Sequence, residues 1–277
     1  MEKACRFGTN EINLKFIDPQ HMKSKFEEIA SQICDCHVHY GQFREDYYDP
    51  EQVVKWFDEL GIDKVGIMPV GTSWESDFYR DQKIMASLPT EKFVPYLWVS
   101  PEMVNADSTL ALYNTLNYKV IKIHAYAIKE WDKMPDKIRT VIEVAYNKGV
   151  PVMFHTGGWR GSNAIQFYKF CREYPEVTFI LAHGKPISQT LTVLKGAKNA
   201  YVDNSFMPIE SMKLICDAGL SDRILFGTDF PVMKTFWPEI SLIDWYKNNV
   251  MELIQTFGEK NFMIWAHENF YKLILKI

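Results

Sequence analysis

Residues 33–39 read ICDCHVH, a short and largely apolar run that ends in two histidines. A run of this kind is typical of a strand buried in a parallel sheet. Similar runs follow along the chain, at residues 64–69, 93–99, 119–124, 150–155, 177–182, 200–204 and 223–227. Successive runs begin 23 to 31 residues apart, which is enough for a strand, a helix and the two loops between them.

The segments between these runs carry helical signals. Asp49-Pro50-Glu51 combines an N-cap residue, a proline at the first helical position and an acid in the first turn, and Gly61 closes that segment. A second segment begins at Pro135 and ends in the same way at Gly149. Further helices are expected at about residues 76–87, 107–116, 161–173, 186–196, 209–218 and 238–257, and over the closing NFMIWAHENFYKLIL.

This alternation predicts an α/β protein with one domain over residues 1–277. A (β/α)8 TIM barrel fits best, with an N-terminal extension of about 30 residues and extra C-terminal helices. An open doubly wound sheet is the alternative, but it needs fewer strands and usually a glycine-rich phosphate loop after the first one. The sequence contains no G-x-G-x-x-G or G-x-x-x-x-G-K-[ST] motif.

The composition narrows the range of partners. The chain has 31 Lys and Arg against 35 Asp and Glu, a formal net charge of −4, so it has no basic footprint for nucleic acid or an anionic membrane. It has neither an apolar run long enough to span a membrane nor the apolar segment of a signal peptide. We therefore expect a cytoplasmic protein with reduced cysteines and a small-molecule ligand.

The histidines gather where a barrel keeps its active site, at the C-terminal ends of the strands. Five of the seven lie at or just after predicted strand ends, and an aspartate follows the last strand: His37, His39, His124, His155, His183 and Asp229. His37 and His39 are two residues apart on a strand, so their side chains share a face and form half of a metal site. An isolated H-x-H is more often hydrogen-bonded structure than a ligand pair, but the full set favours a metal centre.

Five segments resemble, in order, the landmark motifs of the amidohydrolase superfamily. They are DCHVH at 35–39, IKIH at 121–124, FHTGG at 154–158, LAHG at 181–184 and LFGTDFP at 225–231. The resemblance covers about residues 33–277, and the most similar branch is the amidohydrolase 2 group. That branch contains metal-dependent hydrolases together with decarboxylases related to aminocarboxymuconate semialdehyde decarboxylase.

The resemblance implies one catalytic divalent metal ion, usually zinc. Its implied ligands are His37, His39, His155 and Asp229. It also implies that His183 acts beside the ion on the substrate or the leaving group. Asp229 is expected to take a proton from the attacking water and return it to the leaving group. Asp35 shares the parity of the two histidine ligands and is expected to orient one of them through its second ring nitrogen.

Lys122 opens an alternative with two metal ions. Elsewhere in the superfamily a lysine on the fourth strand is carboxylated and bridges two ions, with the histidine after strand six, here His183, as a ligand of the second. Because the single-metal branch often carries a similar I-K-I-H segment, one ion is the preferred prediction. Carboxylation would require a neutral amine, which a desolvated site favours.

The loops after the strands should bind the substrate. Trp159, Arg160, His124 and Tyr126 are placed to line the pocket, and the Arg160 guanidinium could clamp a carboxylate. A solvated loop arginine is an equally good interpretation of Arg160, and His124 could instead be structural. Cys34 and Cys36 alternate with the histidines, so they are expected to face the surrounding helices as buried thiols.

The predicted activity is the hydrolysis of an amide, lactone or ester bond in a small molecule by a metal-activated water. The alternative is a non-oxidative decarboxylase, a lyase, which uses the same ligands on an unsaturated or aromatic carboxylic acid. A catalytically silent barrel that only binds a ligand is the third class, and the intact ligand set argues against it. Barrels of this branch are often dimers, so the resemblance allows a homodimer.

Overall fold

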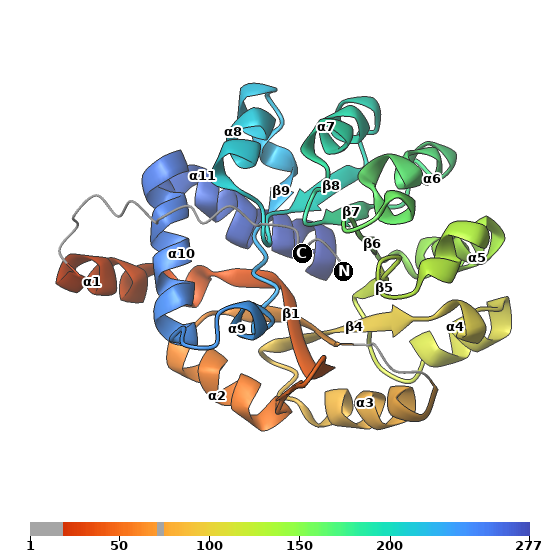
Figure 1. Ribbon diagram of the computed structural model, residues 1–277, viewed down its shortest axis with the longest axis horizontal. Coiled ribbons are helices and arrows are strands. Elements are labelled where there is room, and N and C mark those ends of the chain that lie inside the picture. Colours follow the sequence, from red (N-terminus) through yellow and green to blue (C-terminus); the bar gives the residue numbers. More distant parts are fainter. Residues whose placement is uncertain (1–18, 71–74) are drawn as a thin grey trace, which may run out of the picture.

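The computed structural model describes residues 19–70 and 75–277, and it is a barrel of eight parallel strands surrounded by helices (Figure 1). Neighbouring strands pair in chain order. The strands are β1 (Cys34–Phe43), β3 (Lys64–Pro69), β4 (Phe93–Val99), β5 (Val120–Ile123), β6 (Val152–His155), β7 (Phe179–Ala182), β8 (Ala200–Asp203) and β9 (Ile224–Leu225). Each lies within or overlaps a predicted run, so the TIM-barrel prediction is confirmed.

The barrel closes between its last strand and its first. β9 is only two residues long, but the chain beyond it continues beside β1. The Cys36 N–H donates to the Phe226 carbonyl at 2.9 Å, and the His39 N–H donates to the Phe230 carbonyl at 2.7 Å. The Asp229 N–H donates to the His37 carbonyl at 2.8 Å. Closure therefore places Asp229 directly beside the two histidines of β1.

The helices begin and end largely where the capping signals indicate. The Asp49 carboxylate accepts a hydrogen bond from the Gln52 N–H, and Gly61 ends that helix in the left-handed conformation at φ 68°. Gly149 ends the α5 helix in the same way at φ 65°. The helices are α1 (Pro19–Ile29), α2 (Pro50–Leu60), α3 (Glu75–Ser87), α4 (Ala106–Tyr113), α5 (Pro135–Lys148), α6 (Tyr168–Glu173), α7 (Ile187–Gly196), α8 (Ile209–Asp217), α9 (Met233–Phe236), α10 (Leu242–Phe257) and α11 (Glu259–Met263).

Several elements differ from the prediction. The helix expected from residue 161 begins only at Tyr168, because Asn163 has an extended backbone that separates two short 3-10 turns. A short strand, β2 (Asp46–Tyr48), pairs antiparallel with the end of β1. The closing segment continues from α11 as π-helical turns at Ile264–Glu268 and Tyr271–Leu275. Over the described parts of the chain, no helix combines the length and apolarity that crossing a membrane requires.

The apolar side chains form two main layers. The larger layer lies between the strands and the outer helices. The smaller one fills the barrel interior and is continued by Phe270, Leu273 and Ile274 of the closing segment. Cys34 and Cys36 belong to this interior layer, so the expectation that they face the helices was wrong. The cause is a register shift in β1 between Asp35 and Val38, which breaks the simple alternation of the strand.

Candidate metal centre at the barrel mouth

Three of the four implied ligands converge at the mouth of the barrel. His37 and His39 come from β1, and Asp229 follows β9. The two Nε2 atoms are 3.1 Å apart. Oδ1 of Asp229 lies 2.9 Å from the His39 Nε2 and 3.5 Å from the His37 Nε2. Two ligands of one tetrahedral zinc ion are about 3.3 Å apart, so this spacing fits a single shared ion.

The partners of the two imidazoles orient their lone pairs toward that point. Nδ1 of His37 donates to Oδ2 of Asp203 at 2.8 Å, and Nδ1 of His39 faces the Pro69 carbonyl at 3.4 Å. Since a carboxylate and a carbonyl both require a donor, both Nδ1 atoms carry the proton and both Nε2 atoms present a lone pair. Two lone pairs and one carboxylate oxygen then face one another, an arrangement that could hold a metal ion.

Lys122 supplies one proton donor to this group. Its side chain is fully buried, and Nζ lies 3.4 Å from the His37 Nε2. Burial lowers its pKa to about 8, although the Asp203 and Asp229 carboxylates act in the opposite direction. A lowered pKa increases the fraction of neutral amine, which carboxylation requires, so Lys122 is compatible with one ion or two.

His155, the fourth implied ligand, lies outside this close group. Its Nδ1 is 3.1 Å from Nε2 of His183. His183 in turn directs Nδ1 at the Ser205 carbonyl, 3.2 Å away, so that nitrogen carries the proton. Nδ1 of His155 must then be the donor between the two rings, which leaves its Nε2 with a lone pair. The ligand role of His155 stays a prediction.

Asp203, at the end of β8, was not found from the sequence. Besides orienting His37, its Oδ1 accepts the backbone N–H of His183 at 3.1 Å and that of Ser205 at 3.0 Å. It is completely buried. Burial alone would raise its pKa, but the His37 and His183 imidazoles outweigh burial and hold it below the usual range. Its position at the end of the seventh predicted strand is the signal that could have identified it.

Asp35 was expected to orient a ligand imidazole, and the structure contradicts this. Its carboxylate accepts the backbone N–H of His37 at 3.0 Å and the Thr228 hydroxyl at 2.6 Å. The register shift of β1 between Asp35 and Val38 explains the failure of the parity argument. Asp35 instead ties β1 to the segment that carries Asp229.

Burial favours the neutral form of four imidazoles at the mouth, those of His39, His124, His155 and His183. Burial lowers the pKa of His183 to about 3, although the Asp229 carboxylate acts in the opposite direction. Burial also lowers the pKa values of His39, His124 and His155. Burial would raise the pKa of Asp229, but the adjacent His37 and His39 outweigh it and hold that pKa well below its usual range. Neutral imidazoles and an ionised carboxylate are the states that bind a metal ion.

Two residues of the mouth have a left-handed backbone. His183 has a φ of 69° and Asp229 a φ of 58°. A residue other than glycine held in this region carries strain of about 1–3 kcal/mol, and such strain gathers at functional sites. Here the left-handed backbone sets the directions of the His183 and Asp229 side chains, the two to which catalytic roles were assigned.

Aromatic rings form one wall beside the histidines. The His124 ring stacks between Trp98 and His155, with centroid distances of 4.8 and 4.0 Å. Tyr126 stacks on His155 at 5.5 Å and is 45% exposed, so a flat ligand could reach it. Trp159 is partly buried and donates its indole N–H to the Ala125 carbonyl.

Two cations lie on the loops of this side. Arg160 is exposed on the 3-10 turn Arg160–Ser162, so its role as a carboxylate clamp stays a prediction. Lys185, which the sequence interpretation did not single out, is partly buried with Nζ 5.9 Å from the centroid of Phe206. The Phe206 ring lies 6.3 Å from that of His183. Burial lowers the pKa of Lys185, against the attraction of Asp229 and Asp203.

Solved structures with the same fold are distant in sequence. A probable 2-pyrone-4,6-dicarboxylic acid hydrolase from Acinetobacter baumannii, with citric acid bound, has a TM-score of 0.64 at 13% identity over 88% of this chain and 99% of its own. An amidohydrolase from Burkholderia multivorans with bound zinc has a TM-score of 0.65 at 11% identity, over 88% of this chain and 99% of its own. A manganese-bound 5-carboxyvanillate decarboxylase from Novosphingobium aromaticivorans has a TM-score of 0.62 at 12% identity, over 94% of this chain and 86% of its own.

These likenesses show the fold, and the family is established by the sequence. No curated protein sequence matches the chain. The family model described as amidohydrolase matches residues 34–247, which runs from the first barrel strand into α10 and takes in all the mouth residues described above. The chain belongs to the amidohydrolase family.

Proposed function

We propose that the chain is a cytoplasmic, metal-dependent hydrolase that cleaves an amide, lactone or ester bond of a small molecule. The observation that carries the proposal is the convergence of His37, His39 and Asp229, whose donor atoms lie 2.9 to 3.5 Å apart with their lone pairs directed inward. The proposed ion is a single Zn²⁺, with His155 as its further ligand. A carboxylated Lys122 and a second ion at His183 are the alternative form of the centre.

A bound divalent ion would supply a water of lowered pKa and a Lewis acid for the bond under attack. Asp229 directs Oδ1 at the two histidines, which leaves its second oxygen to accept the water's proton and return it to the leaving group. His183 stands at the same mouth, neutral and held by Ser205, to stabilise developing charge or transfer a proton. Asp203 keeps His37 in the tautomer that presents Nε2.

The substrate would lie against the aromatic wall. Tyr126 and Trp159 offer flat apolar contacts, and His124 is close enough to contribute a polar one. Arg160 and Lys185 lie on the loops of the same side, where either cation could hold an anionic group of the substrate.

The position of Lys185 also favours a second candidate function, that of a non-oxidative decarboxylase. A partly buried ammonium group near the mouth would bind the carboxylate of an acid substrate. A decarboxylase and a hydrolase are both found among the solved structures of this fold, so the fold does not separate the two reactions.

The test is a screen of carboxylic acids, lactones and cyclic amides in which hydrolysis and carbon dioxide release are assayed in parallel. We expect hydrolysis that is lost on chelation and restored by Zn²⁺. Carbon dioxide release without hydrolysis would transfer the assignment to the lyase. Full activity in chelated protein with no measurable metal would overturn both forms of the proposal.

A further inference from the structure

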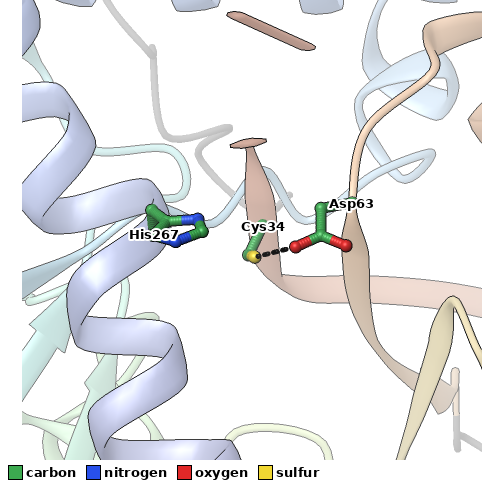
Figure 2. A group of neighbouring side chains, drawn as sticks. All are labelled: Cys34, Asp63 and His267. Atoms are coloured by element: carbon green, nitrogen blue, oxygen red, sulfur yellow. Dashed lines mark hydrogen bonds between the residues drawn. The ribbon is translucent and has the colours of Figure 1, made fainter. Parts of the chain in front are cut away.

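A second group of side chains that could bind a metal ion lies at the N-terminal end of β1. Cys34 is the first residue of that strand, Asp63 directly precedes β3, and His267 lies on the π-helical turn Ile264–Glu268. Figure 2 shows the His267 and Asp63 side chains on either side of the Cys34 sulfur. His37 lies three positions along the strand from Cys34, about 10 Å, and His39 lies five positions away, about 16 Å, so this group is separate from the mouth.

The spacing of the three side chains suits one small ion. Sγ of Cys34 lies 3.8 Å from Oδ2 of Asp63, and a nitrogen of His267 completes a set in which all donor atoms lie within 4.8 Å of one another. A sulfur and an oxygen that bind the same tetrahedral zinc ion are about 3.5 Å apart. Only a small adjustment would therefore bring the three donors onto one ion.

Hydrogen bonds to neighbouring groups hold two of the donors in place. Nδ1 of His267 lies 2.8 Å from the Gln32 carbonyl and must donate to it, so Nε2 presents its lone pair. The Tyr271 hydroxyl donates to Oδ2 of Asp63 at 2.6 Å, and Nζ of Lys64 lies 3.1 Å from Oδ1. Metal-binding histidines and carboxylates are held by outer hydrogen bonds of this kind.

Charge and chemistry favour a soft divalent cation. Without an ion, the Cys34 thiol donates to Oδ2 of Asp63 at 3.8 Å. A divalent ion that displaces this proton would be balanced by one thiolate and one carboxylate. A thiolate with an imidazole selects Zn²⁺ over Mg²⁺ or Ca²⁺.

We propose that Cys34, Asp63 and His267 form a second, structural metal site that binds Zn²⁺ or a similar thiophilic divalent cation. The three protein ligands leave the fourth position to solvent. The site joins the closing π-helical segment to the starts of β1 and β3, and so fastens the segment that continues the barrel interior. It does not depend on the activity proposed for the mouth.

Cobalt substitution separates the two sites, because only this one includes a thiolate. The full chain is stripped of metal, reduced and titrated with Co²⁺ while the near-ultraviolet thiolate-to-cobalt charge-transfer band is recorded. We expect the final intensity of the band to correspond to one thiolate-bound cobalt ion per chain, with further Co²⁺ taken up at the mouth without adding to it. Asp229→Asn, which alters only the mouth, should leave the band unchanged, so failure at one site is distinguishable from failure at the other.

Substitutions then test the ligands. Cys34→Ser should abolish the band, whereas Cys171→Ser, which removes another buried thiol, should leave it intact. His267→Gln replaces a partly exposed side chain and should fold normally, with the affinity for Co²⁺ lowered on the order of 10-fold or more. A wild-type chain without the band, or a band that survives Cys34→Ser, would overturn the proposal.

Discussion

Both ends of β1 carry side chains that could bind a metal ion, but the surroundings of the two groups differ. Toward the C-terminal end, His37 and His39 meet Asp229, which follows the last strand, and Asp203 at the end of β8 supports His37. At the N-terminal end, Cys34 meets groups that directly precede β3 or lie on the closing segment.

The two ends differ in backbone strain and in the number of polar groups that they bury. The mouth holds His183 and Asp229 in left-handed backbone and crowds several neutral imidazoles around two buried carboxylates. The N-terminal end, which we call the base, carries Cys34, Asp63 and His267 and is continuous with the apolar interior. There the Asp63 carboxylate accepts a hydrogen bond from Tyr271 and pairs with Lys64. In barrels of this type the C-terminal face supports catalysis and the opposite face supports stability. Substitutions at the mouth should therefore reduce activity, and those at the base should reduce the free energy of unfolding.

Asp229→Asn should have the largest effect. It removes the negative charge and the proton acceptor at once, and we expect kcat/KM to fall by about 10³-fold or more. Asparagine tolerates the left-handed backbone that Asp229 adopts, so the melting temperature should stay close to that of the wild type. Steady-state kinetics and a thermal melt on the same preparation measure both. Wild-type kcat/KM in this variant would remove Asp229 from the chemistry.

Phe270→Ala tests the opposite end. Phe270 is completely buried in the interior layer, and its truncation should lower the free energy of unfolding by about 3–5 kcal/mol. Denaturant unfolding gives this value. At temperatures well below the melting transition, kcat per folded molecule should match that of the wild type. A loss of kcat without a loss of stability would mean that the two ends are coupled.

Asp203→Asn should have an intermediate effect at the mouth. The substitution keeps the shape of the side chain but removes the charge that fixes the His37 tautomer, so we expect metal affinity to fall by about 10–100-fold. Competition with a chromogenic chelator measures the affinity. Excess metal should restore most of the activity, and a loss that excess metal leaves unchanged would show that Asp203 acts in some other way.

Much of the barrel could be predicted from the sequence because its signals are local. An apolar run indicates a buried strand, and residues such as Asp49 and Gly61 mark helix ends through hydrogen bonds made within a few positions. His37, His39 and Asp229 could be brought together because each lies at the end of a strand, and barrel closure makes those ends meet.

What could not be predicted depends on contacts between distant segments. The register shift after Asp35 has no marker in the sequence, and it reversed the expected orientations of Asp35 and Cys36. Asp203 stands 166 residues from the imidazole that it orients, so its role is revealed only when barrel closure brings the end of β8 near β1. The base cluster was missed because His267 and Cys34 meet only when the closing segment packs against the barrel.

Tyr271→Phe should have the smallest effect, and it tests the base without creating a cavity. The hydroxyl donates to Oδ2 of Asp63 at 2.6 Å, and its loss should lower the free energy of unfolding by about 1 kcal/mol. The kinetic constants at the mouth should not change, because Asp63 lies at the start of its strand and the mouth lies at the ends. Denaturant unfolding of the wild type and the variant, each with metal removed, isolates the hydrogen bond from any contribution of an ion. If the variant instead lost activity with unchanged stability, Tyr271 would act at the mouth. The claim that one end of β1 supports activity and the other stability would then be wrong.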